Sequence, residues 1–190
     1  MVGRGGTGAS DPDAGPSGSG GSGQGGTQTG AGGCPLAAPI PIPGHTFAIY
    51  AINVTNKILV LKNLSGEPVN LDTEWQWCSI PKYGRLVEAP RTIPVDGLHF
   101  LDISDSFVGD VNGGDLGIYI KPDYMNPNSI DTYVIWGEGF ESGLRENVAA
   151  QANIWTFGER ATINPGDAGL IATGRTDLPS GYASAPIECF

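Results

Sequence analysis

The chain has 190 residues, and its 20 acidic and 10 basic side chains give it a formal net charge of −10 at neutral pH. Fourteen of its 30 glycines lie in residues 1–33, whereas the 157 residues that follow have the length of one ordinary domain. The glycines have no three-residue period, which excludes a collagen. The sequence has no run of about 18 apolar residues, so it predicts no transmembrane helix.

The charge balance argues against a nucleic-acid partner. Residues 34–190 hold 9 basic and 18 acidic side chains, and the basic ones are scattered singly between positions 57 and 175. Binding to a phosphate backbone normally requires a basic stripe that releases counterions. We therefore expect no DNA or RNA partner.

Residues 1–33 predict a disordered linker. They consist mainly of Gly, Ser, Thr, Gln and Pro with no large apolar residue after Val2, so they cannot bury enough surface to offset the entropy of ordering. A chain of this length reaches roughly 30 Å and could tether a domain to an anchor, a wall or a second domain. An extension without any role is an equally good interpretation. The proline-rich residues 34–45 predict an extended lead-in to the domain.

From residue 46 onward, short apolar runs alternate with turn residues, and no helical period persists for three turns. This pattern predicts an all-β domain, and the number of runs favours a sandwich. The predicted strands are 47–53, 57–63, 75–80, 98–103, 116–120, 132–136 and 169–173. Every residue of 58–61 is apolar, which indicates a central strand covered on both faces. Residues 141–151 predict one short helical turn.

Several of these segments resemble a known family. The runs ILVLKN (58–63), GEPVNL (66–71) and WQW (75–77) resemble the opening of lamin-tail-like domains, and DTYVIWG (131–137) is similar to a segment of secreted bacterial members. The resemblance implies an immunoglobulin-like β-sandwich over residues 46–190, in a secreted or surface-attached protein. It also implies an accessory module without catalytic residues. Any signal peptide or anchor would then lie upstream, because residues 1–33 contain no signal-peptide pattern.

Three cysteines allow one disulfide. Cys78 ends a strand-like run and Cys189 lies near the end of the chain, whereas Cys34 borders the glycine-rich tail. We expect Cys78 and Cys189 to pair, which agrees with a secreted protein. The alternative is a cytoplasmic protein with three reduced cysteines. The wide spacing of the cysteines argues against a structural zinc site.

One acidic loop is a candidate calcium site, because calcium prefers hard oxygen ligands. Its five oxygen-bearing residues are Asp102, Asp105, Asp110, Asn112 and Asp115. Their order does not follow the EF-hand pattern, so a solvated acidic turn is the alternative interpretation. Calcium is the only cofactor that the sequence suggests.

A second candidate site combines aromatic and acidic residues. Trp136 and Tyr124 could stack on a ligand such as a sugar, and Glu138 and Glu141 flank the segment that follows Trp136. Such carboxylate pairs are common in acidic loops. Arg145 and Glu146 predict a local ion pair. His99 alternates with apolar neighbours, which favours an outward position on a strand over a role as a general base.

The sequence therefore predicts a non-catalytic extracellular β-sandwich module for surface attachment or recognition, expected to be a monomer. Its partner would be a surface polymer or a protein. The main alternative is a calcium-dependent carbohydrate-binding module, which requires the acidic loop to bind metal. A third class, a small extracellular hydrolase, requires Glu138 and Glu141 to face one cleft.

Overall fold

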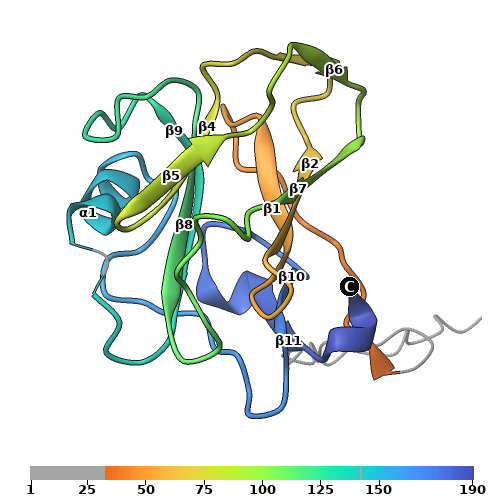
Figure 1. The fold of residues 1–190 in the computed structure, drawn as a ribbon, viewed down its shortest axis with the longest axis vertical. Helices are drawn as coiled ribbons and strands as arrows, with labels where there is room; N and C mark the ends of the chain where they lie inside the picture. Colours follow the sequence, from red (N-terminus) through yellow and green to blue (C-terminus); the bar gives the residue numbers. More distant parts are fainter. Residues whose placement is uncertain (1–32, 142) are drawn as a thin grey trace, which may run out of the picture.

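A computed structural model of the chain describes residues 33–141 and 143–190. Within these residues it has eleven strands, one α-helix and short 3₁₀ turns, and every strand pair is antiparallel. The predicted all-β architecture is confirmed (Figure 1). The predicted linker, apart from Gly33, lies outside the described residues.

The first sheet has five strands, three of them built from segments near the two ends of the described chain. In spatial order they are β11 (Tyr182–Ala185), β10 (Gly169–Ala172), β1 (Phe47–Asn53), β2 (Ile58–Asn63) and β7 (Leu98–Asp102). The lead-in at 34–45 runs beside this sheet, since the Ala38 N–H donates to the Ala172 carbonyl at 3.0 Å.

The second sheet has four strands and a helix on its outer side. Its order is β5 (Lys82–Arg85), β4 (Gln76–Ser79), β8 (Gly114–Tyr119) and β9 (Ile130–Trp136). A two-stranded ribbon joins β3 (Val69–Leu71) to β6 (Arg91–Ile93). Helix α1 (Leu144–Gln151) lies on the side of β8 and β9 that faces away from β1 (Figure 1).

One apolar core joins the inner faces of both sheets. Leu59 and Leu61 of β2 are fully buried in it, together with Leu116 and Ile118 of β8. The intervening residue Val60 faces the opposite side, where it joins a second, smaller apolar cluster. The prediction that 58–61 forms a central strand is thus confirmed, because β2 lies between β1 and β7. Its inner face is covered by the core, whereas Ile58 and Val60 on its outer face line an open groove.

The side chains of β7 that face the core differ from the prediction. His99 is buried and its Nε2 lies 2.8 Å from the Leu86 carbonyl, whereas Leu98 and Phe100 are exposed. The expected outward position of His99 is therefore wrong. A strand has a period of two, so a pattern in which polar and apolar residues alternate fits either phase, and only the partner of the side chain decides between them.

Candidate functional site

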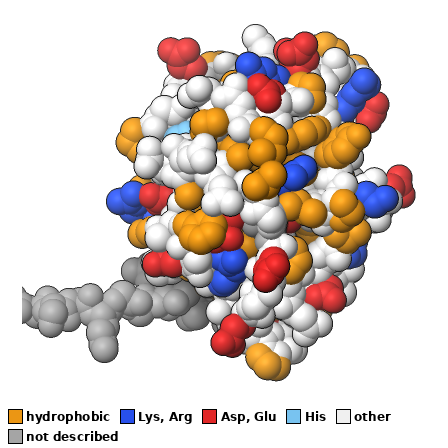
Figure 2. All heavy atoms as spheres, turned by 90° about the vertical axis from the view of Figure 1, so that its left-hand side faces the viewer, with side chains coloured by type: hydrophobic (Ala, Val, Ile, Leu, Met, Phe, Trp, Pro, Cys, Tyr) orange, Lys and Arg blue, Asp and Glu red, His pale blue; other side chains and the backbone are white. Residues whose placement is uncertain are grey.

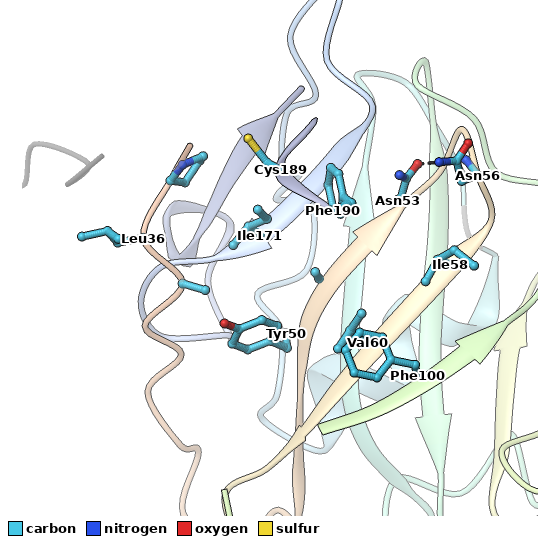
Figure 3. Close-up of a pocket in the computed structure, with 13 residues that line it drawn as sticks. Leu36, Tyr50, Asn53, Asn56, Ile58, Val60, Phe100, Ile171, Cys189 and Phe190 are labelled. Carbon is cyan, nitrogen blue, oxygen red and sulfur yellow. Dashed lines mark hydrogen bonds between the residues drawn. The ribbon is translucent and has the colours of Figure 1, made fainter. Parts of the chain in front are cut away.

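An apolar groove of about 390 Å³ lies on the outer face of the five-stranded sheet (Figure 3). Its floor is formed by Val60 and Ile171, two buried residues of the second cluster. Its rim is formed by Leu36, Phe100 and Phe190, whose exposed fractions are 48%, 64% and 41%. Contiguous exposed apolar surface of this kind typically marks a binding site.

A β-bulge in β1 places an aromatic side chain in this groove. The register of β1 against β2 shifts between Ile49 and Ala51, so that Tyr50 is an extra residue in β1. Because of this extra residue, Tyr50 and Ala51 both belong to the outer cluster, whereas Ile49 belongs to the core. The bulge thus enlarges the apolar outer face without removing a residue from the core.

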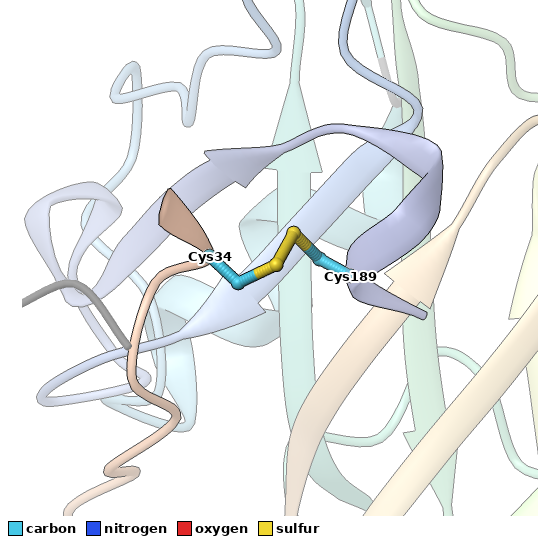
Figure 4. Close-up of a disulfide and its surroundings, with 2 residues drawn as sticks. All are labelled: Cys34 and Cys189. Carbon is cyan, nitrogen blue, oxygen red and sulfur yellow. A yellow bond between two sulfur atoms is a disulfide. The ribbon is translucent and has the colours of Figure 1, made fainter. Parts of the chain in front are cut away.

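A disulfide fixes one wall of the groove. Cys34 is bonded to Cys189 in the terminal 3₁₀ turn η3 (Ile187–Cys189), with 5.6 Å between their Cα atoms (Figure 4). The bond secures the segments that carry Leu36 and Phe190, and both residues belong to the lining of the groove.

The predicted pairing of Cys78 with Cys189 is therefore wrong. Cys78 is a free, fully buried cysteine in β4, in the four-stranded sheet, whereas η3 lies beside the five-stranded sheet. The prediction left Cys34 unpaired because it borders the glycine-rich tail, but the residues that follow it pack along β10. Cys34 is thereby brought within bonding distance of Cys189.

The polar side chains of the groove are those of Tyr50, Asn53 and Asn56. Asn53 is buried, and its Oδ1 accepts hydrogen bonds from the Thr55 and Asn56 amides at 3.1 and 2.9 Å. The lining contains no Asp, Glu, Lys, Arg or His side chain. General acid–base chemistry needs a proton-transferring side chain within hydrogen-bond reach. The mainly apolar lining is therefore suited to binding an apolar ligand.

The acidic residues predicted to bind calcium do not form one cluster. Among the described residues, no group of three or more His, Cys, Asp or Glu side chains is arranged to hold a metal ion. Asp102 accepts the Ser104 amide at 2.8 Å, and Asp110 accepts the Asn112 amide at 2.7 Å. These two carboxylates thus each stabilise their own turn, as Asp side chains commonly do.

The other three residues of the predicted calcium loop lie in different surroundings. Asp105 and Asn112 are exposed, whereas Asp115 is fully buried in β8. The Asp115 carboxylate accepts hydrogen bonds from the Ile80 amide at 3.1 Å and the Tyr133 hydroxyl at 3.3 Å. Burial raises the pKa of Asp115 to about 6. Its environment is that of a structural group inside the domain.

The residues of the predicted aromatic and acidic site do not form one site. Trp136 is fully buried, donates its indole N–H to the Asp110 carbonyl at 2.7 Å and stacks against Phe107, so it offers no ring face to a ligand. Glu138 and Glu141 are exposed near the end of β9.

Tyr124 belongs to a separate surface on the α1 side of the molecule. Its ring lies 5.4 Å from that of Tyr83 and 5.7 Å from the Arg145 guanidinium. Figure 2 shows hydrophobic side chains gathered on this face with Lys and Arg side chains among them. We call the exposed residues Tyr83, Met125 and Leu144 the helix-side patch.

Arg145 reaches into the domain instead of pairing with Glu146. Its Nε donates to the Cys78 sulfur at 3.0 Å, while Glu146 binds Arg160, with 2.9 Å between Oε2 and Nη2. The predicted Arg145–Glu146 pair is thus corrected. Burial raises the pKa of Cys78, and the neighbouring Arg145 only partly opposes this shift. A buried thiol with a raised pKa is a weak nucleophile.

A second cavity, of about 420 Å³, is polar. Its lining includes His45, Asn128, Asp131 and Asn153. The Asp131 carboxylate already accepts the amides of Thr46 and Phe47 at 2.8 and 2.7 Å, which ties the start of β1 to β9. This carboxylate is therefore a structural link between the two sheets.

Comparisons of the chain with protein-family models, with curated proteins and with solved structures found no match. Within the described residues, none of the helices has the length and apolar character needed to cross a membrane. The groove itself was not predicted from the sequence. The only local signal was the alternation of residues 98–101, and that pattern did not determine whether Leu98 and Phe100 or His99 would be exposed.

Proposed function

We propose that the domain is a non-catalytic extracellular recognition module that binds its partner through the apolar groove. The observation that carries the proposal is the lining of the groove, where exposed rings of Phe100 and Phe190 stand over a buried aliphatic floor. Exposed aromatic side chains beside an apolar surface are frequent anchors of protein recognition.

The disulfide supports the extracellular part of this proposal. Disulfides persist in oxidising compartments and are rare where thiols are kept reduced. The Cys34–Cys189 bond closes a loop of 155 residues in sequence separation and at the same time borders the groove. The pairing of antiparallel sheets around one core is compatible with an immunoglobulin-like, lamin-tail-like module, which we retain as part of the proposal.

Binding of the neutral dye Nile red tests whether the groove accepts an apolar ligand. A neutral probe avoids repulsion by the net charge of −10. We expect Phe190→Ser to weaken dye binding by about tenfold, because it removes an aromatic wall worth roughly 1 to 2 kcal/mol of apolar contact. Fluorescence titration measures the dissociation constant.

Phe157→Ser is the matched control. Phe157 has an exposed fraction of 60% and is not part of the groove lining, so its replacement should leave dye affinity unchanged. Equal dye binding by wild type and Phe190→Ser would contradict the proposal. Loss of binding on Tyr83→Ser alone would assign recognition to the helix-side patch instead.

A further inference from the structure

Strand β7 is the outer edge of the five-stranded sheet, beyond β2. Two hydrogen bonds flank its ladder with β2. The Asn63 amide donates to the Gly97 carbonyl, and the Ile103 amide donates to the Lys57 carbonyl, both at 2.9 Å. In an antiparallel pair, bonded and non-bonded residue pairs alternate. These two bonds therefore determine which backbone groups of β7 face β2.

The alternation turns the backbone groups of His99 and Leu101 toward β2, and those of Leu98, Phe100 and Asp102 away from it. Among the described residues, no further strand or isolated bridge pairs with this outer side. β7 thus presents a row of amide and carbonyl groups that is available to another strand.

The opposite edge of this sheet is covered. Ser184 of β11 accepts the Asn164 amide at 2.7 Å and donates to the Asp167 carboxylate at 2.5 Å, so a turn lies against that strand. A turn held against an edge strand in this way hinders the approach of a further strand.

Both edges of the four-stranded sheet are also protected. Ala161 hydrogen-bonds along β9, where its amide donates to the Ile135 carbonyl at 2.9 Å and its carbonyl accepts from the Gly137 amide at 3.2 Å. β5 carries the basic residues Lys82 and Arg85, and charged side chains of this kind discourage strand pairing. β7 has no Lys, Arg or proline, so among the edges of the two larger sheets in the described residues it is the one left open.

The side chains of β7 indicate what could pair with it. Leu98 and Phe100 are exposed on the same face as the groove, and Phe100 is part of the groove lining. Asp102 follows them on this face with a fully exposed carboxylate. Hydrogen bonds from Ser104 hold the pKa of Asp102 below its usual value, so this carboxylate is charged at neutral pH. The outer face of β7 thus presents two apolar side chains and then one negative charge, spaced two residues apart.

The charge of the chain argues against a second copy as the occupant. Two copies would each bring a net charge of −10. An antiparallel pair centred on Phe100 would also place each Asp102 beside the apolar Leu98 of the other copy, without a compensating cation. A partner with basic side chains would be attracted to the acidic chain, whereas a second copy would be repelled.

We propose that β7 is a docking edge for an extended peptide segment of a partner, which adds as a sixth strand with alternate apolar side chains beside Leu98 and Phe100 and a Lys or Arg near Asp102. Strand addition of this kind takes affinity from backbone hydrogen bonds and specificity from alternate side chains. The inference builds on the proposed recognition function and names its partner as a basic, alternating apolar peptide.

Amide hydrogen exchange with a synthetic peptide tests the proposal. The probe is a peptide of about nine residues in which valine alternates with threonine and each end carries a lysine. At ten times the dissociation constant, exchange of the Leu98, Phe100 and Asp102 amides should slow by about tenfold. The amides of His99 and Leu101, which already bond to β2, should change little.

Charge variants test the role of Asp102. Asp102→Asn keeps an acceptor for the Ser104 amide but removes the charge, and should weaken peptide binding about two- to fivefold. Asp72→Asn is the matched control, because Asp72 also accepts the amide two residues ahead, that of Glu74, but lies after β3. The control should bind the peptide as wild type does.

Three outcomes would overturn the inference. The first is unchanged exchange at Leu98 and Phe100 with saturating peptide, and the second is equal binding of a peptide with the same composition but no alternation. The third is protection of these amides without peptide, together with a dimer in analytical ultracentrifugation, which would assign the edge to a second copy. Phe190 lies beside Gly169 of β10, and β1 and β2 stand between β10 and β7. The Nile red test can therefore succeed while the peptide test fails, and the reverse.

Discussion

Asp115 is a fully buried carboxylate in β8 whose two oxygens accept one amide and one phenol hydrogen bond. Burial is the largest influence on its pKa, which is raised from 3.8 to about 6. Two neutral hydrogen-bond donors and the positive charge of Arg145 therefore do not fully replace the water that the charged form loses. At neutral pH the charged Asp115 side chain is therefore less favourable in the folded domain than in the unfolded chain.

The raised pKa of Asp115 predicts that the free energy of unfolding depends on pH. Between the unfolded pKa and about pH 6 the folded state holds a proton that the unfolded chain has released, so the free energy of unfolding falls as pH rises through this window. Asp115→Asn removes this titration. The stability of wild type relative to the variant should therefore fall by roughly 2 to 3 kcal/mol between about pH 4 and about pH 7.

Urea unfolding of both proteins across this pH range measures the effect. Asp110→Asn is the control, because Asp110 is an exposed carboxylate that also accepts backbone amides. A constant difference between wild type and Asp115→Asn at all pH values would contradict the raised pKa.

At the scale of elements, the disulfide joins the lead-in before β1 to η3, across a sequence separation of 155 residues. The bond secures two segments that otherwise contribute few side chains to the main core. It therefore maintains the wall of the groove as well as the stability of the fold.

Removal of this bond should be costly. For a loop of this length, the lost restriction of the unfolded chain corresponds to about 5 kcal/mol at most. We expect Cys34→Ser with Cys189→Ser to lower the free energy of unfolding by about 2 to 5 kcal/mol and to weaken Nile red binding. Chemical denaturation measures the first effect and fluorescence the second.

The reference for this experiment is Cys78→Ala, which removes a thiol that is not in the disulfide. That variant creates a small cavity and should leave the groove unchanged. A double serine variant as stable as wild type would mean that the covalent bond contributes nothing beyond the contacts around it.

The elements that the sequence predicted share one property, a local apolar pattern. The run 58–61 became β2, and 132–136 lies within the longer β9. The missed strands lack this pattern. β5 has the sequence KYGR and β11 has YASA, and both are strands only because a neighbouring strand supplies their hydrogen bonds.

At the scale of the whole molecule, acidic residues outnumber basic ones two to one. Like charges on a compact domain repel one another, and salt screens this repulsion. The carboxylates of the predicted calcium loop lie apart, with Asp115 inside the domain and Asp102 exposed at the end of β7. General screening and specific metal binding therefore predict different responses to ions.

We expect sodium chloride at about 0.3 M to raise the melting temperature by a few degrees through screening. Millimolar calcium at constant ionic strength should leave it unchanged, because no group of ligands is assembled for the ion in the part of the chain that the structure describes. Calorimetry measures both. A rise with calcium that chelator reverses and Asp110→Ala abolishes would restore the calcium-dependent alternative.

The sequence by itself determined the mainly β architecture, the position of the strongest strands and the absence of a basic stripe, because each depends on residues close in the chain. The tertiary structure decided the Cys34–Cys189 bond, the inward phase of His99, the burial of Trp136 and the apolar groove. Each of these depends on which distant segments meet. Period-two patterns constrain a strand to two faces but leave open which face is covered and which edge stays unpaired.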